Sequence, residues 1–311
     1  MTVADGRTIT VAVLTYRRPA ALAEALLGII EQVDQVPESR LLVIDNDQEP
    51  SAERVVAAVT AEHPRVFYVH EPRPGIATAR NRAMIECGAQ DLLVFIDDDE
   101  RPAERWLIGL VSTWDRYRAP AVVGPVVSTF PGPLDPWITA GGFFNRARRP
   151  TGTLVGTAAT NNLLLDLAQI RPLSLAFDES FGLSGGSDTV FTRQLVAKGG
   201  RIVWCDEALV FDAVPSDRTT RRWVTARVAR MGNSDARAAV YLADRGPGRA
   251  LARVAQTVRG CVRVAAGLGR MVYGRVIRSI THDARGTRTM LRGAGIIRGA
   301  WGSVVYEYRR S

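Results

Sequence analysis

Four consecutive acidic residues, Asp97 to Glu100, stand at the end of an apolar run at 92–97 (LLVFID). Like charges in contact repel, so such a cluster needs a neutralising partner. A divalent cation such as Mg²⁺ or Mn²⁺ takes carboxylate oxygens and usually shares its coordination with substrate phosphates. In an extended chain Asp97 and Asp99 lie on one side and Asp98 points the other way. The spacing suits a metal–diphosphate complex; a solvated acidic turn that caps the next helix is the alternative that it leaves open.

Polar residues also come directly after two earlier apolar runs. The run at 9–14 (ITVAVL) leads into 15–18 (TYRR), and the run at 41–45 (LLVID) leads into Asn46 and Asp47. In open parallel sheets, ligands bind at the carboxyl ends of the strands. Together with the acidic run, these residues predict a ligand site at one edge of a sheet. No Gly-x-Gly-x-x-Gly comes after the first run, which disfavours an ordinary dinucleotide site.

Two expected helix starts carry side chains that suit ligand binding or catalysis. The segment 75–81 (GIATARN) opens a helix, where free N–H groups and the helix dipole favour an anion. Arg80 in this segment suits a phosphate, or it is an ordinary solvated arginine. Asp188 comes after a Gly185-Gly186 turn, in the first turn of another helix. It either compensates the helix dipole or acts as a general base, and composition alone leaves both open.

The elements that must position these groups alternate between strands and helices over the first 130 residues. The apolar runs predict strands at 9–14, 41–45, 66–70, 92–97 and 121–128. Helices are expected after Pro19, after Ser51 as N-cap, and at 76–88 and 104–116. Strands this uniformly apolar are covered on both faces. The pattern predicts an α/β fold with a Rossmann-like, mostly parallel sheet flanked by helices.

Composition narrows the class of protein. The 311 residues are 46% hydrophobic, enough for a sizeable core and too many for general disorder. Three widely spaced cysteines, Cys87, Cys205 and Cys261, fit neither a disulfide framework nor a zinc site and favour a reducing cytosol. The sequence predicts no signal peptide and, with no run of 18 apolar residues, no membrane-spanning helix.

Several motifs occur in a recognisable order: VAVLTYRRP (11–19), VIDND (43–47), GIATARN (75–81), FIDDDE (95–100), VVGPV (122–126), TNNLLL (160–165) and FGLSGGSDTVFTRQLVAKGG (181–200). The likeness continues through AVPSDR (213–218), the helix around Arg222-Trp223, and YEYRR (306–310). In order and spacing, the chain resembles the family-2 glycosyltransferases of the GT-A fold, and among them the succinoglycan-type exopolysaccharide glucosyltransferases. The resemblance covers nearly the whole chain.

The resemblance implies a role for each matching residue. Asp188 would be the catalytic base of a single inverting displacement. The nucleotide would be bound by Thr15, Tyr16, Arg18, Asp45, Asp47, Arg80 and Asp97. Mn²⁺ or Mg²⁺ would be held by Asp97 and Asp99. The acceptor and sugar side would be shaped by Asn161, Asn162, Gly185 and Gly186. Trp137, in a Gly/Pro-rich segment at 130–157, either stacks on acceptor sugar rings or anchors that loop.

Two departures from the family pattern concern the site itself. Ser187 stands where the family has the glutamate of Gly-Gly-Glu-Asp. Many relatives carry a histidine, a possible metal ligand, after a late strand, and the matching run here is 210–212 (VFD). Asp212 would then be a metal ligand through a hard oxygen, or metal binding would be weaker.

Net charge divides the chain. The total is +8, but residues 240–311 hold 14 arginines and three acidic residues, a net charge of +11, and the remainder is at −3. Gly246-Pro247-Gly248 marks a boundary. We expect a catalytic domain at 1–245, with a nucleotide-sugar half at 1–129 and an acceptor half at 130–245, and then a basic helical tail at 246–311.

The start of the tail is amphipathic. At ~100° per residue, its arginines gather on one side of a helix and its aliphatic residues on the other. The arginines are Arg249, Arg253, Arg259, Arg263 and Arg270, and the aliphatic residues are Leu251, Val254, Val258, Val262 and Ala265. Basic helices over 249–298 either lie on an anionic membrane or pack their apolar stripe on the catalytic domain.

The resemblance implies an inverting glycosyltransferase that moves a sugar, with UDP-hexose favoured, to a saccharide or lipid-linked saccharide acceptor. The expected location is cytoplasmic, peripheral on the inner face of the plasma membrane. A nucleotidyltransferase is one alternative, but it usually has a glycine-rich, lysine-containing start after the first strand. A relative that binds nucleotide sugar without turnover is another, prompted by Ser187. No nucleic-acid-binding motif accompanies the basic tail, so no nucleic acid partner is expected.

Overall fold

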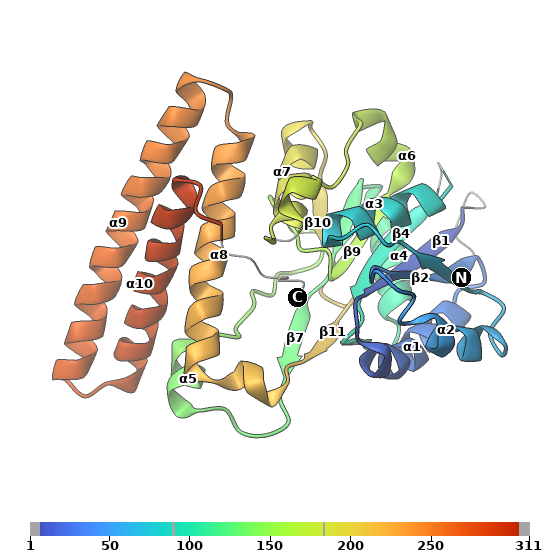
Figure 1. Cartoon of the computed structure of the whole chain (residues 1–311), viewed down its shortest axis with the longest axis horizontal. Helices are drawn as coiled ribbons and strands as arrows, with labels where there is room; N and C mark the ends of the chain where they lie inside the picture. The colour runs from blue at the N-terminus through green and yellow to red at the C-terminus, as the bar shows by residue number, and fades with distance from the viewer. Residues whose placement is uncertain (1–6, 89–90, 183, 305–311) are drawn as a thin grey trace. The chain divides into compact units, whose positions relative to one another are not determined.

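The computed structural model describes residues 7–88, 91–182 and 184–304, so the motif at 306–310 lies outside the described residues. The chain forms two compact units (Figure 1). The sheet unit comprises Met1–Val127, Arg146–Leu183 and Ser187–Ala213. The helical unit comprises Ser128–Asn145, Ser184–Gly186 and Val214–Ser311.

An eight-stranded sheet forms the centre of the sheet unit, in the order β3-β2-β1-β4-β9-β6-β10-β8. The strands in that order are Val66–His70, Ser39–Asp45, Ile9–Thr15, Leu92–Asp97, Asn162–Asp166, Ala121–Val123, Ile202–Trp204 and Leu154–Val155. β3, β2, β1 and β4 are mutually parallel, as are β6 and β10, whereas β9 and β8 run antiparallel to their neighbours. The predicted mostly parallel sheet is confirmed.

Helices cover both faces of this sheet. They are α1 (Pro19–Asp34), α2 (Glu53–Thr60), α3 (Ile76–Glu86), α4 (Trp106–Tyr117), α6 (Leu167–Ile170) and α7 (Ser187–Ala197), with short 3-10 turns at Arg171–Leu173 and Glu179–Phe181. Ile9, Val11 and Val13 of β1 join the buried cluster under α1, α2 and α4. Ala12 joins the cluster that contains residues of α3 and α7. Because alternate side chains are buried on opposite faces, the whole strand reads as apolar.

Two sequence-based expectations were wrong in detail. The single strand expected at 121–128 is divided into two strands, β6 and β7 (Val126–Thr129). Between them, the backbone of Gly124 lies so close to Ala208 that a Cβ on Gly124 would be 2.2 Å from the Ala208 carbonyl oxygen. β7 belongs to a second sheet, of order β5-β11-β7, with β5 at Glu100–Pro102 and β11 at Val210–Ala213. Ser51 does not cap α2; Oδ2 of Asp45 accepts from the Ala52 N–H at 2.7 Å instead.

The helical unit is built on three long helices, α8 (Arg221–Leu242), α9 (Pro247–Val276) and α10 (Ile280–Ala300), together with α5 (Pro136–Gly141) and a 3-10 turn at Ser216–Thr219. α10 lies between α8 and α9 (Figure 1). Glycines make the close contacts: a Cβ on Gly267 of α9 would lie 2.3 Å from the Met290 nitrogen of α10. One on Gly295 of α10 would lie 2.0 Å from the Ala229 oxygen of α8. At these glycines, the helices of the unit therefore pack with their backbones in direct contact.

α9 begins at Pro247, beside the break predicted at Gly246. The contacts nevertheless group α8 with α9 and α10, so the compact units divide the chain elsewhere than at 245. The division into 1–245 and 246–311 remains a prediction about domains. In the part of the chain that the structure describes, no helix is long and apolar enough to cross a membrane.

Candidate active site

The carboxyl ends of the central parallel strands meet at one edge, as the sequence predicts. In the register of the sheet, Thr15 of β1 lies opposite Asp45 of β2, and Leu14 lies opposite Asp97 of β4. Asp45 is itself opposite His70, the last residue of β3. This edge brings together polar groups that are up to 83 residues apart in the chain.

Two of the four acidic residues at this edge, Asp98 and Asp99, form ion pairs with Arg18. The Thr15 hydroxyl donates to Oδ2 of the buried Asp98 at 2.7 Å. A guanidinium nitrogen of Arg18 lies 2.8 Å from Oδ2 of Asp99 and 3.4 Å from Oδ1 of Asp98. Thr15 and Arg18, both expected at the nucleotide, thus also hold the acidic run in place.

The other two acidic residues, Asp97 and Glu100, have carboxyl groups whose ionised forms are disfavoured by burial. Burial, with Asp99 as the next contribution, raises the pKa of Asp97 to about 7, and Arg80 only partly offsets it. Burial and Asp97 likewise raise the pKa of Glu100, whose carboxylate accepts from the Asp97 N–H at 3.1 Å and from Asn161 at 2.7 Å. A carboxyl pair that resists ionisation in this way favours a bound cation.

Asp212 reaches the same place from a distant part of the chain. β11 pairs antiparallel with β5, and the register sets Asp212 opposite Glu100. A guanidinium nitrogen of Arg146 lies 2.6 Å from Oδ2 of Asp212. Nothing in the local sequence pointed to Arg146 as a partner.

The donor set suits a hard divalent ion in its chemistry, since all the side-chain donors are oxygens and negative charge is in excess. Among the residues that the structure describes, however, no group of three His, Cys, Asp or Glu side chains is arranged to hold a metal ion. Asp99 and Asp212 are each engaged by an arginine. Asp97, Asp99 and Asp212 as metal ligands therefore remain a prediction.

Arg80 and Ser187 form a second part of the site. A guanidinium nitrogen of Arg80, in α3, donates to the Ser187 hydroxyl at 2.8 Å, and its guanidinium carbon lies 5.5 Å from the ring centre of Phe177. Within the described residues, no carboxylate forms an ion pair with this buried arginine. Its charge is thus available to an anion.

Asp188 comes next in the chain, at the start of α7. It is half-buried, and its Oδ1 accepts from the N–H of Thr189 at 2.7 Å. In the described part of the chain, Oδ2 of Asp188 has no hydrogen-bond partner. One carboxylate oxygen is therefore oriented by the helix start and the other is available to a proton.

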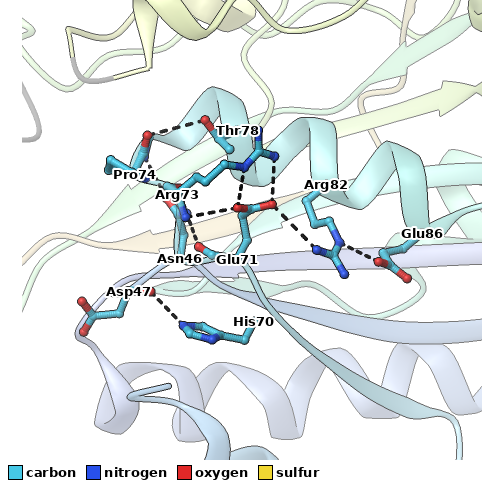
Figure 2. A network of polar contacts seen from close by, with 10 residues as sticks. Asn46, Asp47, His70, Glu71, Arg73, Pro74, Thr78, Arg82 and Glu86 are labelled. Atoms are coloured by element: carbon cyan, nitrogen blue, oxygen red, sulfur yellow. Dashed lines mark hydrogen bonds and ion pairs between the residues drawn. The ribbon is translucent and has the colours of Figure 1, made fainter. Parts of the chain in front are cut away.

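Asn46, which the sequence analysis placed at the ligand-binding edge without a specific role, fixes the loop that leads into α3. Figure 2 shows its side-chain amide donating to the carbonyls of Glu71 (2.8 Å) and Arg73 (2.7 Å). Its Oδ1 accepts from the Gly75 N–H at 3.1 Å, where φ is +127°. Arg73 in turn binds both oxygens of Glu71 (Figure 2). This network determines where α3, and with it Arg80, begins.

Comparison with known proteins identifies the family. The model of the family described as "Glycosyl transferase family 2" matches residues 10–166. The succinoglycan biosynthesis protein ExoM of Rhizobium meliloti (strain 1021) is 37% identical over 234 residues, which cover 74% of each chain. The chain belongs to glycosyltransferase family 2.

Solved structures show the same fold at low sequence identity. S. aureus TarS 1–349 superposes with a TM-score of 0.53 at 12% identity, over 91% of this chain and 90% of that one. The structure of the same protein in complex with UDP-GlcNAc superposes with a TM-score of 0.53 at 13% sequence identity, over 91% of each chain. The structure of GalNAc-T7 with UDP, GalNAc and Mn²⁺ superposes with a TM-score of 0.56 at 13% sequence identity, over 78% of this chain and 49% of GalNAc-T7. The chain thus spans about half the length of that protein. The predicted GT-A fold and family are confirmed.

The resemblance led us to expect a glutamate where this chain has Ser187, and the structure shows what Ser187 contacts. The buried serine hydroxyl accepts from Arg80, where a carboxylate would form an ion pair with it. A serine in an otherwise matching motif was the sequence signal for this difference, but its partner became visible only in the structure.

Other proposed nucleotide residues are held by the protein itself. Both oxygens of the fully buried Asp45 are used: Oδ2 accepts from the Ala52 N–H and the Tyr68 hydroxyl, and Oδ1 accepts from the Asp47 N–H. The Asp47 carboxylate accepts from Arg17 at 3.2 Å. The cation of Arg17 also lies 5.3 Å from the ring centre of Tyr16. Asp45 thus organises this edge of the sheet.

The proposed acceptor residues fall in different settings. All the hydrogen-bonding groups of the Asn162 amide contact the protein: Oδ1 accepts from the indole of Trp106, and Nδ2 donates to the carbonyls of Pro125 and Ala208. Gly185 and Gly186 have φ of +73° and +100°, which L-residues with side chains rarely adopt.

Trp137 is part of the buried cluster of the helical unit. It stacks on Phe143, and its indole N–H donates to Asp283 of α10 at 2.7 Å. These contacts agree with the second expectation for this residue, that it anchors its loop. Its role toward an acceptor stays a prediction.

Proposed function

We propose that this glycosyltransferase is an inverting hexosyltransferase that takes a nucleotide sugar, UDP-hexose in the first place, and transfers the sugar to a saccharide or lipid-linked saccharide in cell-surface or exopolysaccharide synthesis. The observation that carries the proposal is the acidic edge, where burial and neighbouring carboxylates raise the pKa of Asp97 and of Glu100, so that a bound cation would favour their ionised forms. Such an edge suits a metal-bound diphosphate. The likeness to a succinoglycan biosynthesis protein supports the choice of pathway class.

In the proposed reaction, Asp188 takes the proton of the acceptor hydroxyl through its available Oδ2 as that oxygen attacks the anomeric carbon. The bond from the anomeric carbon to the diphosphate oxygen breaks, and the nucleoside diphosphate leaves with the electron pair. A single displacement inverts the configuration, whereas a retaining double displacement needs a second carboxylate as nucleophile.

Arg80 and the acidic run act on the leaving group. Arg80, which forms no ion pair with a carboxylate of the described residues, would bind a phosphate. Asp97 and Asp99 would hold Mn²⁺ or Mg²⁺, with Asp212 as a further oxygen ligand once Arg146 is displaced. Such an ion would supply charge neutralisation to the departing diphosphate.

Further side chains complete the proposed substrate contacts. Tyr16, Thr15, Arg18, Asp45 and Asp47 would form the nucleotide side, with Asp45 acting through the backbone it holds. Asn161, Asn162, Gly185, Gly186 and Trp137 would form the acceptor side.

The decisive experiment replaces the base. Asp188→Asn should lower turnover of UDP-hexose by about 10³-fold, because general base catalysis contributes on the order of 10² to 10⁴. UDP affinity measured by calorimetry should stay within about twofold, since among the described residues no hydrogen bond or ion pair joins Asp188 to Arg80 or the acidic run. The matched control is Asp115→Asn, an exposed carboxylate of α4 paired with Arg118. Near-normal turnover of Asp188→Asn would remove this residue as base, and retained anomeric configuration in the product would overturn the inverting mechanism.

Ser187 favours one second candidate, a relative that binds nucleotide sugar without turnover. Wild-type protein that is stabilised by UDP-hexose and Mn²⁺, yet releases no UDP with any saccharide acceptor tested, would support that candidate against the first.

The proposed location is cytoplasmic and peripheral at the inner face of the plasma membrane. The arginine-rich helices of the helical unit support it, because the cytoplasmic leaflet is rich in anionic lipid. A lipid-linked acceptor would be found at the same surface.

A further inference from the structure

One side of α9 carries apolar side chains that the protein leaves exposed. Six of them form the outer stripe: Leu251, Val254, Val258, Val262, Val272 and Val276. They are between 49% and 76% exposed. At ~100° per residue, all six fall within a sector of about 80° on the helix. At 1.5 Å per residue, the stripe from Leu251 to Val276 extends along about 38 Å of the helix.

The interior of the helical unit does not use this stripe. α9 contacts α10 through the opposite face, where Gly260, Gly267 and Gly274 recur every seven residues and are buried. The sequence had left open whether the apolar stripe packs on the rest of the protein. Within the helical unit, packing uses the glycine face, so the aliphatic residues are left for another contact.

Arginines flank the outer stripe on both sides. Around the helix axis, Arg259 and Arg270 lie about 100° to 120° from the centre of the stripe on one side, and Arg253 and Arg275 lie about as far from it on the other side. All four of these arginines are exposed. Residues 247–300 contain 11 arginines and one acidic residue, Asp283.

The acidic groups nearest these arginines are few. Asp235 of α8 lies 3.6 Å from Arg259, and Asp283 lies 3.0 Å from Arg275. The crowding of positive charge is strong enough that burial, together with Arg259 and Arg292, lowers the pKa of Arg263. Among the described residues of this surface, positive charge therefore exceeds negative charge.

We propose that the outer stripe of α9 lies on an anionic lipid surface, with its aliphatic side chains at the acyl boundary and the flanking arginines on lipid phosphates. An interfacial helix needs this combination of an apolar face and a cationic border. A second copy of the chain is the weaker occupant, because α9 contains no acidic residue and two such helices would bring their arginines together. The inference rests on the proposed function, because the lipid contact would give the enzyme access to a lipid-linked acceptor. Lipid binding itself is measured without catalysis.

The test is sedimentation of the full chain with phosphatidylcholine vesicles, with and without phosphatidylglycerol. We expect tight binding only when phosphatidylglycerol is present. Leu251→Ser, Val258→Ser and Val262→Ser in combination should weaken it about a hundredfold, because each side chain at the acyl boundary contributes roughly fivefold. Their exposure makes the fold insensitive to the change. The matched control replaces three aliphatic residues of the sheet unit that are equally exposed, Leu27, Ile85 and Leu154, by serine and should bind as the wild type does.

A second variant tests the charges. Arg259→Gln with Arg270→Gln should weaken binding to phosphatidylglycerol vesicles by about twentyfold, since each arginine near an anionic surface contributes roughly fivefold. Added salt should reduce the difference.

Two results would overturn the inference. One is stripe-variant binding equal to that of the wild type. The other is a wild-type dimer in analytical ultracentrifugation that the stripe variant dissociates, which would assign the stripe to a second copy. Turnover of UDP-hexose with a soluble saccharide acceptor, measured on the same variants, keeps the two proposals separate. Vesicle binding without turnover would defeat the proposed function alone, and turnover without vesicle binding would defeat the lipid contact alone.

Discussion

Replacing Asp97 by asparagine should make the metal-free protein more stable at neutral pH. Burial and the neighbouring carboxylates, Asp99 first, raise the pKa of Asp97 to about 7. Compared with an ordinary aspartate near 3.9, this corresponds to roughly 4 kcal/mol of unfavourable ionisation well above pH 7, since each pH unit is worth about 1.4 kcal/mol. Asparagine keeps the shape and carries no charge, so its advantage should reach about 1 to 3 kcal/mol once the new amide's own hydrogen bonding is allowed for.

The sign of the pH dependence is specific. In the folded protein Asp97 keeps its proton up to about pH 7, while the unfolded chain loses it near pH 4. Folding therefore binds a proton between these values, and wild-type stability falls as pH rises from about 4 to about 7 relative to Asp97→Asn. Below pH 4 the two proteins should be alike in this respect.

Chemical unfolding in EDTA-containing buffers from pH 4 to pH 8 measures the difference directly. Glu71→Gln is the matched control with the opposite sign. Although burial raises the pKa of Glu71, hydrogen bonds from Arg73 bring it below the ordinary value. Its carboxylate therefore stabilises the fold above pH 4, and the variant should lose stability at neutral pH. A pH-independent difference between Asp97→Asn and wild type, or a less stable variant at pH 8, would refute the reasoning. Mn²⁺ with UDP should stabilise the wild type and leave Asp97→Asn unchanged.

Three other contacts give testable outcomes. Ser187→Glu should form an ion pair with Arg80 and weaken UDP-hexose binding about tenfold in calorimetry, whereas Ser187→Thr keeps the hydroxyl; equal or tighter binding by the glutamate variant would contradict a phosphate role for Arg80. Gly267→Val places a side chain against the α10 backbone and should destabilise the helical unit by about 3 kcal/mol in urea unfolding. Trp137→Phe leaves Asp283 without its indole donor and should lower thermal stability by about 1 to 2 kcal/mol while UDP binding is unchanged.

The sequence by itself determined the sheet and the acidic edge. Short apolar runs with polar residues directly after them identify buried parallel strands, and the carboxyl ends of such strands meet by geometry. Thr15, Asp45 and Asp97 could therefore be placed together from the order of the strands alone, and the register of the sheet confirms it. The order of the motifs indicated the family, which was confirmed.

Contacts between distant segments were decided only by the tertiary structure. The β5–β11 pairing sets Asp212 opposite Glu100, and no local pattern encodes that register. The hydrogen bond from Arg80 to Ser187 spans 107 residues. Asn162 shows the opposite error: it looked available for a ligand, but its amide is fully used by Trp106, Pro125 and Ala208.

For the basic tail, too, the sequence predicted the helix and the structure decided which of its faces is buried. Periodicity predicted an amphipathic helix from Arg249 onward, and α9 has the expected apolar and arginine-bearing sides. It could not show which face would be buried, because hydrophobicity favours the valines and close packing favours the glycines. The structure buries Gly260, Gly267 and Gly274, since only residues without a Cβ let two helix backbones approach to contact, and this leaves the aliphatic stripe on the outside.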